Sequence, residues 1–410
     1  MNEHVQTAAA EPLFNPLSPE FIRDPYPHYA RMRNTDPVHL NVHGAFVASR
    51  HAEVSLVMRD RRFGKDYVER TIRRYGPKIM EEPIFRSMSH WMLQQDPPDH
   101  TRLRGLVVKA FTARRVEDMR PRIQEVVEQT IDAVIAKGHM DLIEDFAFRL
   151  PVTIICDMLG IPEEHREVFY KGSRDGGRIL DPVPLSPEEI AQANTNNAMA
   201  RMYFEQLFEM RRRNPGNDLT SQLIQAEEAG DKLSNEEMTA NIILLFGAGH
   251  ETTVNLIGNG LLALYRNPDQ LALLKANPSL ITNAVEEFLR YDSSVQLTGR
   301  VALEDIEDLG GKRIPKGETV LCLLGSANRD PAVYPDRPDQ LDITRPNVRP
   351  LSFGGGIHHC LGAQLARIEA EVAVSTLLRR LPDLRLDDAQ NPEWRPTFVL
   401  RGLKRLPASW

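Results

Sequence analysis

Apolar residues recur every three or four positions along much of the chain, which is the pattern of helices that bury one face. The clearest example is the segment 121–137, where Ile and Val residues form a single stripe. The same spacing recurs elsewhere, often with Asp, Asn, Ser or Pro at the first positions of the segment. It predicts further helices over residues 141–147, 196–211, 219–226, 235–266, 268–276, 279–291 and 363–381.

Strand patterns are short and few. They predict strands at residues 38–40, 45–48, 299–303, 313–314, 319–324, 397–400 and 404–406. The chain has 29 prolines, which are densest in two stretches, 181–187 and 330–350, and we expect these stretches to be irregular loops. The fold class is therefore mainly α with small β-sheets. Without repeats or a low-complexity linker, we expect residues 1–410 to form one domain, with residues 1–20 as a loosely ordered lead-in.

Charge and cysteine content narrow the class of protein. The chain has 50 Lys and Arg against 57 Asp and Glu, a net charge of −7, so it lacks the basic excess of a nucleic-acid-binding protein. Its three cysteines are scattered, which favours a reducing compartment, and we expect a cytoplasmic protein. The most apolar run, residues 242–248, is far shorter than the roughly 20 residues needed to span a bilayer.

The strongest local signal is the run Phe-Gly-Gly-Gly-Ile-His-His-Cys-Leu-Gly at residues 353–362. Its glycines let the backbone bend tightly before Cys360, which opens a predicted helix. A helix N-terminus favours a thiolate, so we expect Cys360 to be set up as an anion. Two other interpretations are a buried structural cysteine and a zinc site with His358 and His359. The three residues are crowded together, however, and no second ligand pair accompanies them.

The pattern F-G-x-G-x-H-x-C-x-G resembles the haem-binding loop of the cytochrome P450 family. The resemblance implies that Cys360 is the axial thiolate ligand of the iron of haem b. It further implies that Phe353 packs over the haem near the sulfur and that His358 reaches a haem propionate. His359 occupies a variable position of the motif, and we assign it no role.

A second motif, Ala-Gly-His-Glu-Thr-Thr, lies inside the long apolar helix at residues 248–253. A polar pair there is costly unless it is partnered, and the small Ala248 and Gly249 leave room for a bulky ligand. Taken locally, Thr252 could bond its own helix carbonyl and Glu251 could form a salt bridge. The family's A-G-x-[DE]-T-T motif matches, and it implies that Thr252 hydrogen-bonds dioxygen and that Glu251 relays protons.

A third motif places Glu287 and Arg290 three residues apart on one helix face. Such pairs are common and mostly solvated. In the family, the matching E-x-x-R pair is buried and is locked to an arginine of the Pro-rich loop. Here that arginine is Arg345 or Arg337, and we favour Arg345 because it is nearer to the cysteine loop. The implied role is structural.

Three further residues resemble the family's propionate ligands. His100 and Arg104 lie four residues apart on a helix that follows two prolines, and Arg300 begins a strand. Each could instead form an ordinary surface salt bridge. Because haem carboxylates require charge-assisted donors, the resemblance implies that all three contact them.

The resemblance covers nearly the whole chain and is greatest to the soluble bacterial P450 proteins that take electrons from a separate ferredoxin and its reductase. It implies a monomeric monooxygenase with haem between the long central helix and the helix after the cysteine. One atom of O2 would enter a medium-sized, largely apolar organic substrate, such as a terpenoid or a macrolide-like natural product. The candidate substrate pocket consists of residues 88–93 together with Ile243, Leu244, Gly247, Ala248, Val295, Gln296, Leu297, Thr298, Phe398 and Val399.

A basic run lies in and after the His100 helix. It comprises Arg102, Lys109, Arg114 and Arg115, and it could bind an acidic ferredoxin or simply be a solvated helix face. Two other functions stay open at this point. A haem-thiolate peroxygenase would use hydrogen peroxide and usually lacks the acid–alcohol pair, whereas a non-enzymatic haem sensor would not need a proton relay.

Overall fold

A computed structural model describes residues 12–167, 176–228 and 233–410 of the chain. Most of the described residues are in helices. The helices of nine residues or more that begin after residue 213 lie where the sequence predicts them. The helices from residue 120 onward are α8 (Arg120–Ile135), α9 (Arg149–Leu159), α11 (Pro187–Arg213), α12 (Leu219–Glu228), α13 (Asn235–Arg266), α14 (Pro268–Ala276), α15 (Ile281–Tyr291), α16 (Leu324–Ala327) and α17 (Ala363–Arg380).

The first 120 residues contain short helices that the periodicity did not predict, apart from the helix after the two prolines. Most of these helices have too few turns to show a clear stripe. They are α1 (Pro19–Arg23), α2 (Tyr26–Thr35), α3 (His51–Arg59), α4 (Tyr67–Tyr75), α5 (Pro83–Ser89), α6 (Asp99–Val107) and α7 (Ala113–Glu117). The predicted helix 141–147 is a short π-helix, η4 (Leu142–Ala147). Short 3-10 helices lie at η1 (Pro77–Glu81), η2 (Met92–Gln94), η3 (Val108–Phe111), η5 (Glu163–His165), η6 (Gly176–Leu180), η7 (Pro278–Leu280), η8 (Leu351–Phe353) and η9 (Gly356–His358).

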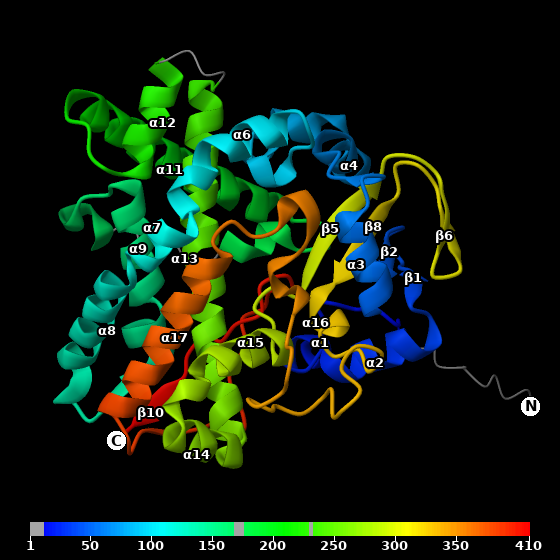
Figure 1. Ribbon diagram of the computed structural model, residues 1–410. Helices are drawn as coiled ribbons and strands as arrows, with labels where there is room; N and C mark the ends of the chain where they lie inside the picture. Colours follow the sequence, from blue (N-terminus) through cyan, green and yellow to red (C-terminus); the bar gives the residue numbers. More distant parts are fainter. Residues whose placement is uncertain (1–11, 168–175, 229–232) are drawn as a thin grey trace, which may run out of the picture.

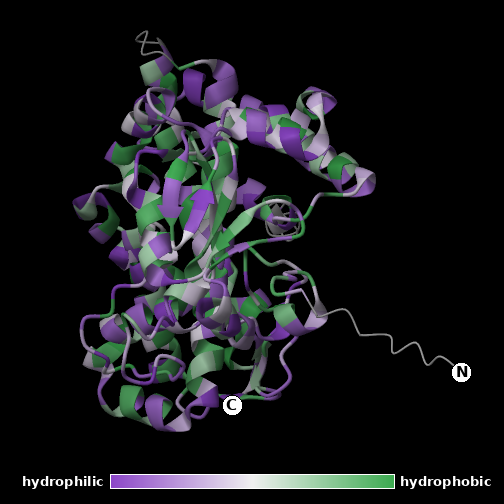
Figure 2. Cartoon of the chain, turned by 90° about the vertical axis from the view of Figure 1, so that its right-hand side faces the viewer, coloured by the Kyte–Doolittle hydropathy of each residue, from purple (hydrophilic) through white to green (hydrophobic). Residues whose placement is uncertain are grey.

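Helix α13 is the central element of the fold. Ser234 and Glu237 form a capping box at its start, which satisfies two of the otherwise unpaired N–H groups. Most of its residues are buried, because α9, α11, α15 and α17 pack around it. Figure 1 shows α13 running through the helical part, with α17 (orange) beside it and the sheet to one side. Figure 2 shows hydrophilic and hydrophobic residues alternating along the outer helices.

The largest sheet has the strand order β1-β2-β8-β5-β3. Strand β8 is parallel to β2 and antiparallel to β5, and β5 is antiparallel to β3. This sheet consists of β1 (Val38–Leu40), β2 (Phe46–Ala48), β3 (Phe63–Gly64), β5 (Leu297–Ala302) and β8 (Thr319–Leu323). The smaller sheets contain β4 (His139–Asp141), β6 (Ile306–Leu309), β7 (Lys312–Ile314), β9 (Arg385–Leu386) and β10 (Pro407–Ser409).

Three predictions about these elements were wrong. Helix α11 begins at Pro187, nine residues earlier than predicted, because Ser186 and Glu189 form a capping box. The predicted strands 397–400 and 404–406 are not strands in the structure, which has one isolated bridge from Leu400 and places β10 after both. Their apolar residues are buried in loops instead of pairing in a sheet.

The lead-in prediction was also wrong for its described part, which begins at residue 12. Phe14 is buried against Phe21 and Phe398, and Ser18 caps α1. Residues 1–11 of that prediction lie outside the described residues. Within the described chain, no helix combines the length and apolar character required to cross a bilayer.

Candidate functional site

The loop that carries Cys360 lies between two single turns and the start of α17. The Cys360 N–H donates to the carbonyl of Phe353 over 2.9 Å, which closes the loop. Gly354 and Gly356 have φ angles of +71° and +64°, in the left-handed region that favours glycine. A Cβ on Gly356 would lie 2.4 Å from the carbonyl oxygen of Met58 in α3. The glycine therefore lets the loop press against α3, while Cys360 remains exposed.

The electrostatic surroundings of the sulfur differ from our expectation. Although Cys360 is exposed by area, nearby protein atoms desolvate its thiol and raise the pKa. The Gly362 N–H and the guanidinium groups of Arg104 and Arg367 oppose this shift without cancelling it. Without a bound metal ion, desolvation of the thiol therefore outweighs the effect of the helix N-terminus that we expected. A metal ion bound to the sulfur would itself remove the proton.

The middle turn of α13 is open on one side. Gly247 and Ala248 are exposed, although Phe246 before them and Thr253 after them are buried. Exposure halfway along a buried helix means that no protein side chain covers this turn. The turn therefore offers a flat, apolar surface on which a ligand could rest.

Gly249 does not belong to that surface. A Cβ at this position would lie 2.9 Å from the Cδ1 atom of Ile155, which belongs to α9. The prediction that Gly249 makes room for a ligand was wrong, since its small size lets two helices approach each other. Of the two small residues, Ala248 is therefore the one that lies on the open surface of the turn.

The acid and the alcohol of the second motif lie next to this open turn. The Thr252 hydroxyl donates to the Ala248 carbonyl over 3.1 Å, the local bond that its sequence position allowed. Glu251 is half-buried, and its Oε1 would lie 3.1 Å from a Cβ on Gly177 of η6. With its hydrogen donated to the helix, the Thr252 oxygen is left with acceptor capacity toward a ligand.

Four cationic or titratable groups converge beside the cysteine loop. The rings of His100 and His358 are 4.3 Å apart, and Arg300 and Lys65 lie close to them. Burial, together with these neighbouring charges, lowers the pKa of His358 to about 2. Its Nε2 atom is buried with no hydrogen-bond partner in the described chain. An unpartnered imidazole nitrogen within a surplus of buried positive charge fits a ligand that brings carboxylate groups.

The sequence did not single out Lys65. No pattern in the run Phe-Gly-Lys-Asp distinguishes it from a surface lysine. Its position becomes clear from the structure, where the pairing of β3 with β5 sets Gly64 opposite Val301. Continuing that register by one residue brings Lys65 next to Arg300.

The other predicted cofactor residues lie around the loop. Arg104 donates to the carbonyl of His359 over 2.7 Å, so α6 is tied to the cysteine loop. His359, to which we gave no role, serves through its backbone. Phe353 is half-buried, and the Arg367 guanidinium lies 4.6 Å above its ring. Arg104 and Phe353 therefore both lie near Cys360.

Glu287 and Arg290 form a fully buried pair. Two Arg290 nitrogens each donate over 2.7 Å to the Glu287 carboxylate, and Arg345 adds a third contact at 3.3 Å. Arg337 instead lies on the surface beside Asp336. Of the two arginines that the sequence offered, Arg345 is thus the one in contact. The cluster joins α15 to the Pro-rich loop that leads to Cys360.

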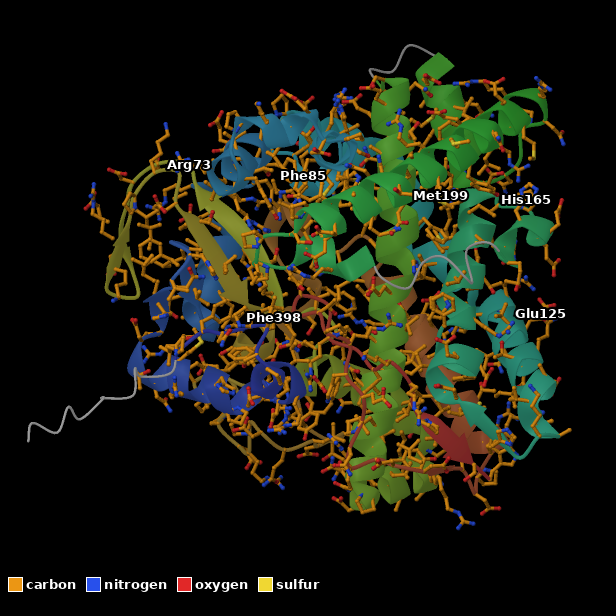
Figure 3. The ribbon with its side chains drawn as sticks, turned by 180° about the vertical axis from the view of Figure 1, so that it is seen from behind. Arg73, Phe85, Glu125, His165, Met199 and Phe398 are labelled. Carbon is orange, nitrogen blue, oxygen red and sulfur yellow. The ribbon has the colours of Figure 1, made fainter. Side chains whose placement is uncertain are left out.

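The predicted pocket residues separate into two groups. Gln296 was a wrong choice for a substrate contact, because its side chain bonds Tyr29 (2.8 Å) and the Ser293 carbonyl (2.7 Å). Phe398, labelled in Figure 3, packs against Phe14 and Phe21, and Leu297 is buried in the same cluster. Leu244 and Val399 are also buried, whereas Ile243, Gly247, Val295 and Thr298 keep exposed or half-buried surface.

One buried acid also went unnoticed in the sequence. Glu369 of α17 is 1% exposed, and burial raises the pKa of its carboxyl to about 8, against the opposing effect of a bond to Thr253. Thr253 follows Thr252 on α13. The helical spacing of α17 marks Glu369 as a core position, but only the packing shows that it meets a polar partner.

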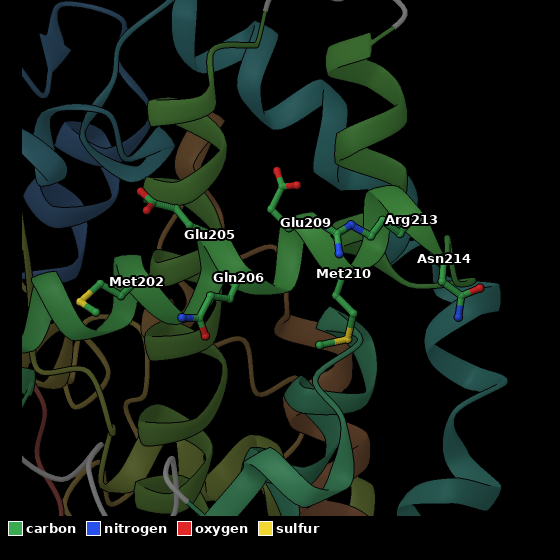
Figure 4. A pocket seen from close by; sticks show the side chains of 7 residues that line it. All are labelled: Met202, Glu205, Gln206, Glu209, Met210, Arg213 and Asn214. Atoms are coloured by element: carbon green, nitrogen blue, oxygen red, sulfur yellow. The ribbon is translucent and has the colours of Figure 1, made fainter.

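A separate hollow lies on the outer side of α11 (Figure 4). It shares no lining residue with the site around Cys360. In the described chain, no three His, Cys, Asp or Glu side chains gather as metal ligands there or elsewhere. The hollow is lined by Met202, Glu205, Gln206, Glu209, Met210, Arg213 and Asn214.

Comparisons with known proteins agree with this geometry. The cytochrome P450 family pattern matches residues 177–402. The chain is 42% identical over 415 residues to the cytochrome P450 monooxygenase PikC of Streptomyces venezuelae, covering 98% of this chain and 96% of PikC. It is 40% identical over 399 residues to the vitamin D(3) 25-hydroxylase of Pseudonocardia autotrophica, covering 96% and 95%.

A solved structure shows the same fold. The crystal structure of P450BioI with an acyl carrier protein carrying hexadec-9Z-enoic acid is 39% identical, with a TM-score of 0.87 over 96% of this chain and all of P450BioI. The open turn of α13, the exposed Cys360 and the buried cationic groups fit the apolar plane and the carboxylates of haem b. The chain belongs to the cytochrome P450 family of haem b monooxygenases.

Proposed function

We propose that the Cys360 sulfur would hold the haem iron as a thiolate and that the chain hydroxylates a medium-sized, largely apolar substrate. The observation that carries this proposal is an exposed cysteine just before α17, next to buried basic side chains among which, in the described part of the chain, His358 Nε2 has no hydrogen-bond partner. His100, Arg104, Arg300 and His358 would bind the haem carboxylates. The bound haem supplies dioxygen activation, consuming two electrons and two protons and releasing one oxygen atom as water.

Two groups on α13 would handle the protons. The Thr252 hydroxyl, held by the Ala248 carbonyl, is positioned to accept a hydrogen bond at the open turn. The Glu251 carboxylate lies one residue away and is half-buried, which suits a group that moves a proton between solvent and the site. In this proposal, the Thr252 Oγ1 atom holds a proton at the site. Glu251 supplies a new proton from solvent after that proton has been used.

We propose a ferredoxin as the source of electrons. The bond from Arg104 to the His359 carbonyl keeps α6 beside the cysteine loop, so the residues after α6 border the proposed docking face. Lys109, Arg114 and Arg115 are exposed there. Arg102 is less suited than we expected, because it pairs with Asp99 and Glu237. Reduction by an acidic ferredoxin should slow as salt concentration rises.

The substrate class rests on the predicted pocket residues that keep exposed surface. Ile243, Gly247 and Val295 are apolar and partly exposed, and Thr298 adds one hydroxyl. One similar protein is named a vitamin D(3) 25-hydroxylase, and P450BioI was crystallised with an acyl carrier protein that carries hexadec-9Z-enoic acid; both molecules are mostly hydrocarbon. These observations support a largely apolar substrate with at most a few polar contacts.

We propose the cytoplasm as the compartment. Cys156 and Cys322 are buried and are not joined to each other or to Cys360. Free thiols of this kind persist where the surroundings are reducing.

The test is the absorption spectrum of the reduced protein with carbon monoxide. We expect a band at about 450 nm, which reports a thiolate ligand. Cys360→His should lose that band while retaining haem, and its survival would overturn the assignment. Turnover assays then separate the other functions: a peroxygenase works with hydrogen peroxide but never with ferredoxin and NAD(P)H, and a sensor shows no turnover at all.

A further inference from the structure

Lys65 is a buried lysine in the short link between β3 and α4. The residue is only 4% exposed, and such deep burial is rare for lysine. The register of β3 on β5 pairs Phe63 with Ala302 and Gly64 with Val301. Lys65 therefore enters the site directly beside Arg300.

The two cations share one acceptor. The Nζ atom of Lys65 donates to the Gly299 carbonyl over 3.3 Å, and an Arg300 guanidinium nitrogen donates to the same oxygen over 3.0 Å. Arg300 is also 3% exposed. Two positive groups that share one acceptor away from water repel each other. An anion placed between them would offset the cost of that repulsion.

The nearest carboxylate is already engaged. Asp96 accepts hydrogen bonds from the backbone N–H groups of Lys65 (2.8 and 2.9 Å) and Asp66 (3.0 Å). The other groups that act on the Lys65 ammonium are Arg300, Arg70 of α4 and the Cys322 thiol of β8. Burial and the positive neighbours hold its pKa well below the ordinary value. Among the described residues, the Asp96 carboxylate acts on both Lys65 and Arg300, but it offsets their charges only in part, because it also accepts from backbone N–H groups.

We propose that Lys65 binds a haem carboxylate together with Arg300, as a cation additional to the ligands that the sequence motifs indicate. This inference rests on the proposed function, because it needs haem in the site. The ammonium donates through one of its hydrogens to a carboxylate oxygen, with Arg300 on the other side of the same group. The haem carboxylate would then neutralise a pair that Asp96 compensates only in part.

The first experiment measures haem release from the full chain. Transfer of haem to an excess of apomyoglobin is followed by absorbance for wild type, Lys65→Met, Lys65→Gln and Lys65→Arg. Loss of one charge-assisted bond predicts release that is about 10- to 100-fold faster in Lys65→Met. Lys65→Gln covers the case in which Met does not fold, and Lys65→Arg should release haem nearly as slowly as wild type. Lys404→Met, which removes an exposed lysine that has no assigned role, is the matched control and should match wild type.

The second experiment asks whether the carboxylate is the group recognised. The full-length apoprotein is loaded with haem or with haem dimethyl ester, in which both carboxylates are blocked. We expect the effect of Lys65→Met on release to be present with haem and absent with the ester. An effect of equal size with both compounds would overturn the proposal, since Lys65 would then act only on the protein.

Release from Lys65→Met at the wild-type rate would also overturn it. That result leaves the proposed function intact if the reduced wild-type protein still shows the band at about 450 nm with carbon monoxide. Absence of that band in wild type would instead refute the thiolate ligand. The two failures can therefore be told apart.

Discussion

Replacing Glu287 by Gln should destabilise the protein strongly, because it removes the carboxylate that contacts two buried guanidinium groups, those of Arg290 and Arg345. Glu287 and Arg290 are both 0% exposed and share two hydrogen bonds of 2.7 Å. Arg345 and the Asp342 N–H also contact the same carboxylate. Gln keeps the size of the side chain but leaves the positive charges uncompensated.

The structure sets the expected magnitude. Breaking a buried pair by removing one charge costs about 3–5 kcal/mol. For a chain of 410 residues, that loss lowers the unfolding midpoint by roughly 3–6 °C. The contacts of Arg290 with the carbonyls of Pro338 and Gln340 remain, so the fold should survive the change.

The assay is thermal unfolding of the haem-loaded protein, followed by far-UV circular dichroism. Arg337→Gln is the matched control: Arg337 is 56% exposed beside Asp336, and its loss should cost less than about 1 kcal/mol. Arg345→Gln should resemble Glu287→Gln more than the control. Equal, small shifts in Glu287→Gln and Arg337→Gln would refute the reasoning that the buried cluster holds the loop in place.

Three further predictions follow from the site. Thr252→Ala should consume electrons without forming an equal amount of product, and unchanged coupling between NAD(P)H oxidation and product would contradict its proton-holding role. Because native Glu369 keeps its proton up to a pKa of about 8, against 4.5 for a free glutamate, the native state binds more protons in this window and loses stability as pH rises. Glu369→Gln should therefore gain in unfolding midpoint over wild type between pH 5 and pH 8, and a constant difference would count against a buried neutral acid. Gly249→Leu should lower the free energy of unfolding by about 1–3 kcal/mol through overpacking. Adding Ile155→Ala should restore part of that loss in denaturant unfolding. An unchanged free energy of unfolding in Gly249→Leu would show that Gly249 lies at an open surface.

Much of the fold follows from local sequence. Helices α13 and α14 begin and end where predicted, because caps and prolines act within one turn. Helix α11 was predicted late because its first turns lack an apolar stripe, although Ser186 and Glu189 mark the start. Phe398 and Leu400 looked like a strand, but alternation cannot show whether a partner strand is available.

The sequence by itself determined the cysteine loop, the α13 motif and the acid–arginine pair, since each depends on residues within a few positions of one another. Only the tertiary structure decided which partners those groups meet. It selected Arg345 over Arg337, turned Gly249 toward Ile155, and placed Lys65 beside Arg300. These contacts join residues tens to hundreds of positions apart, and strand register and helix packing set them, so no local pattern encodes them.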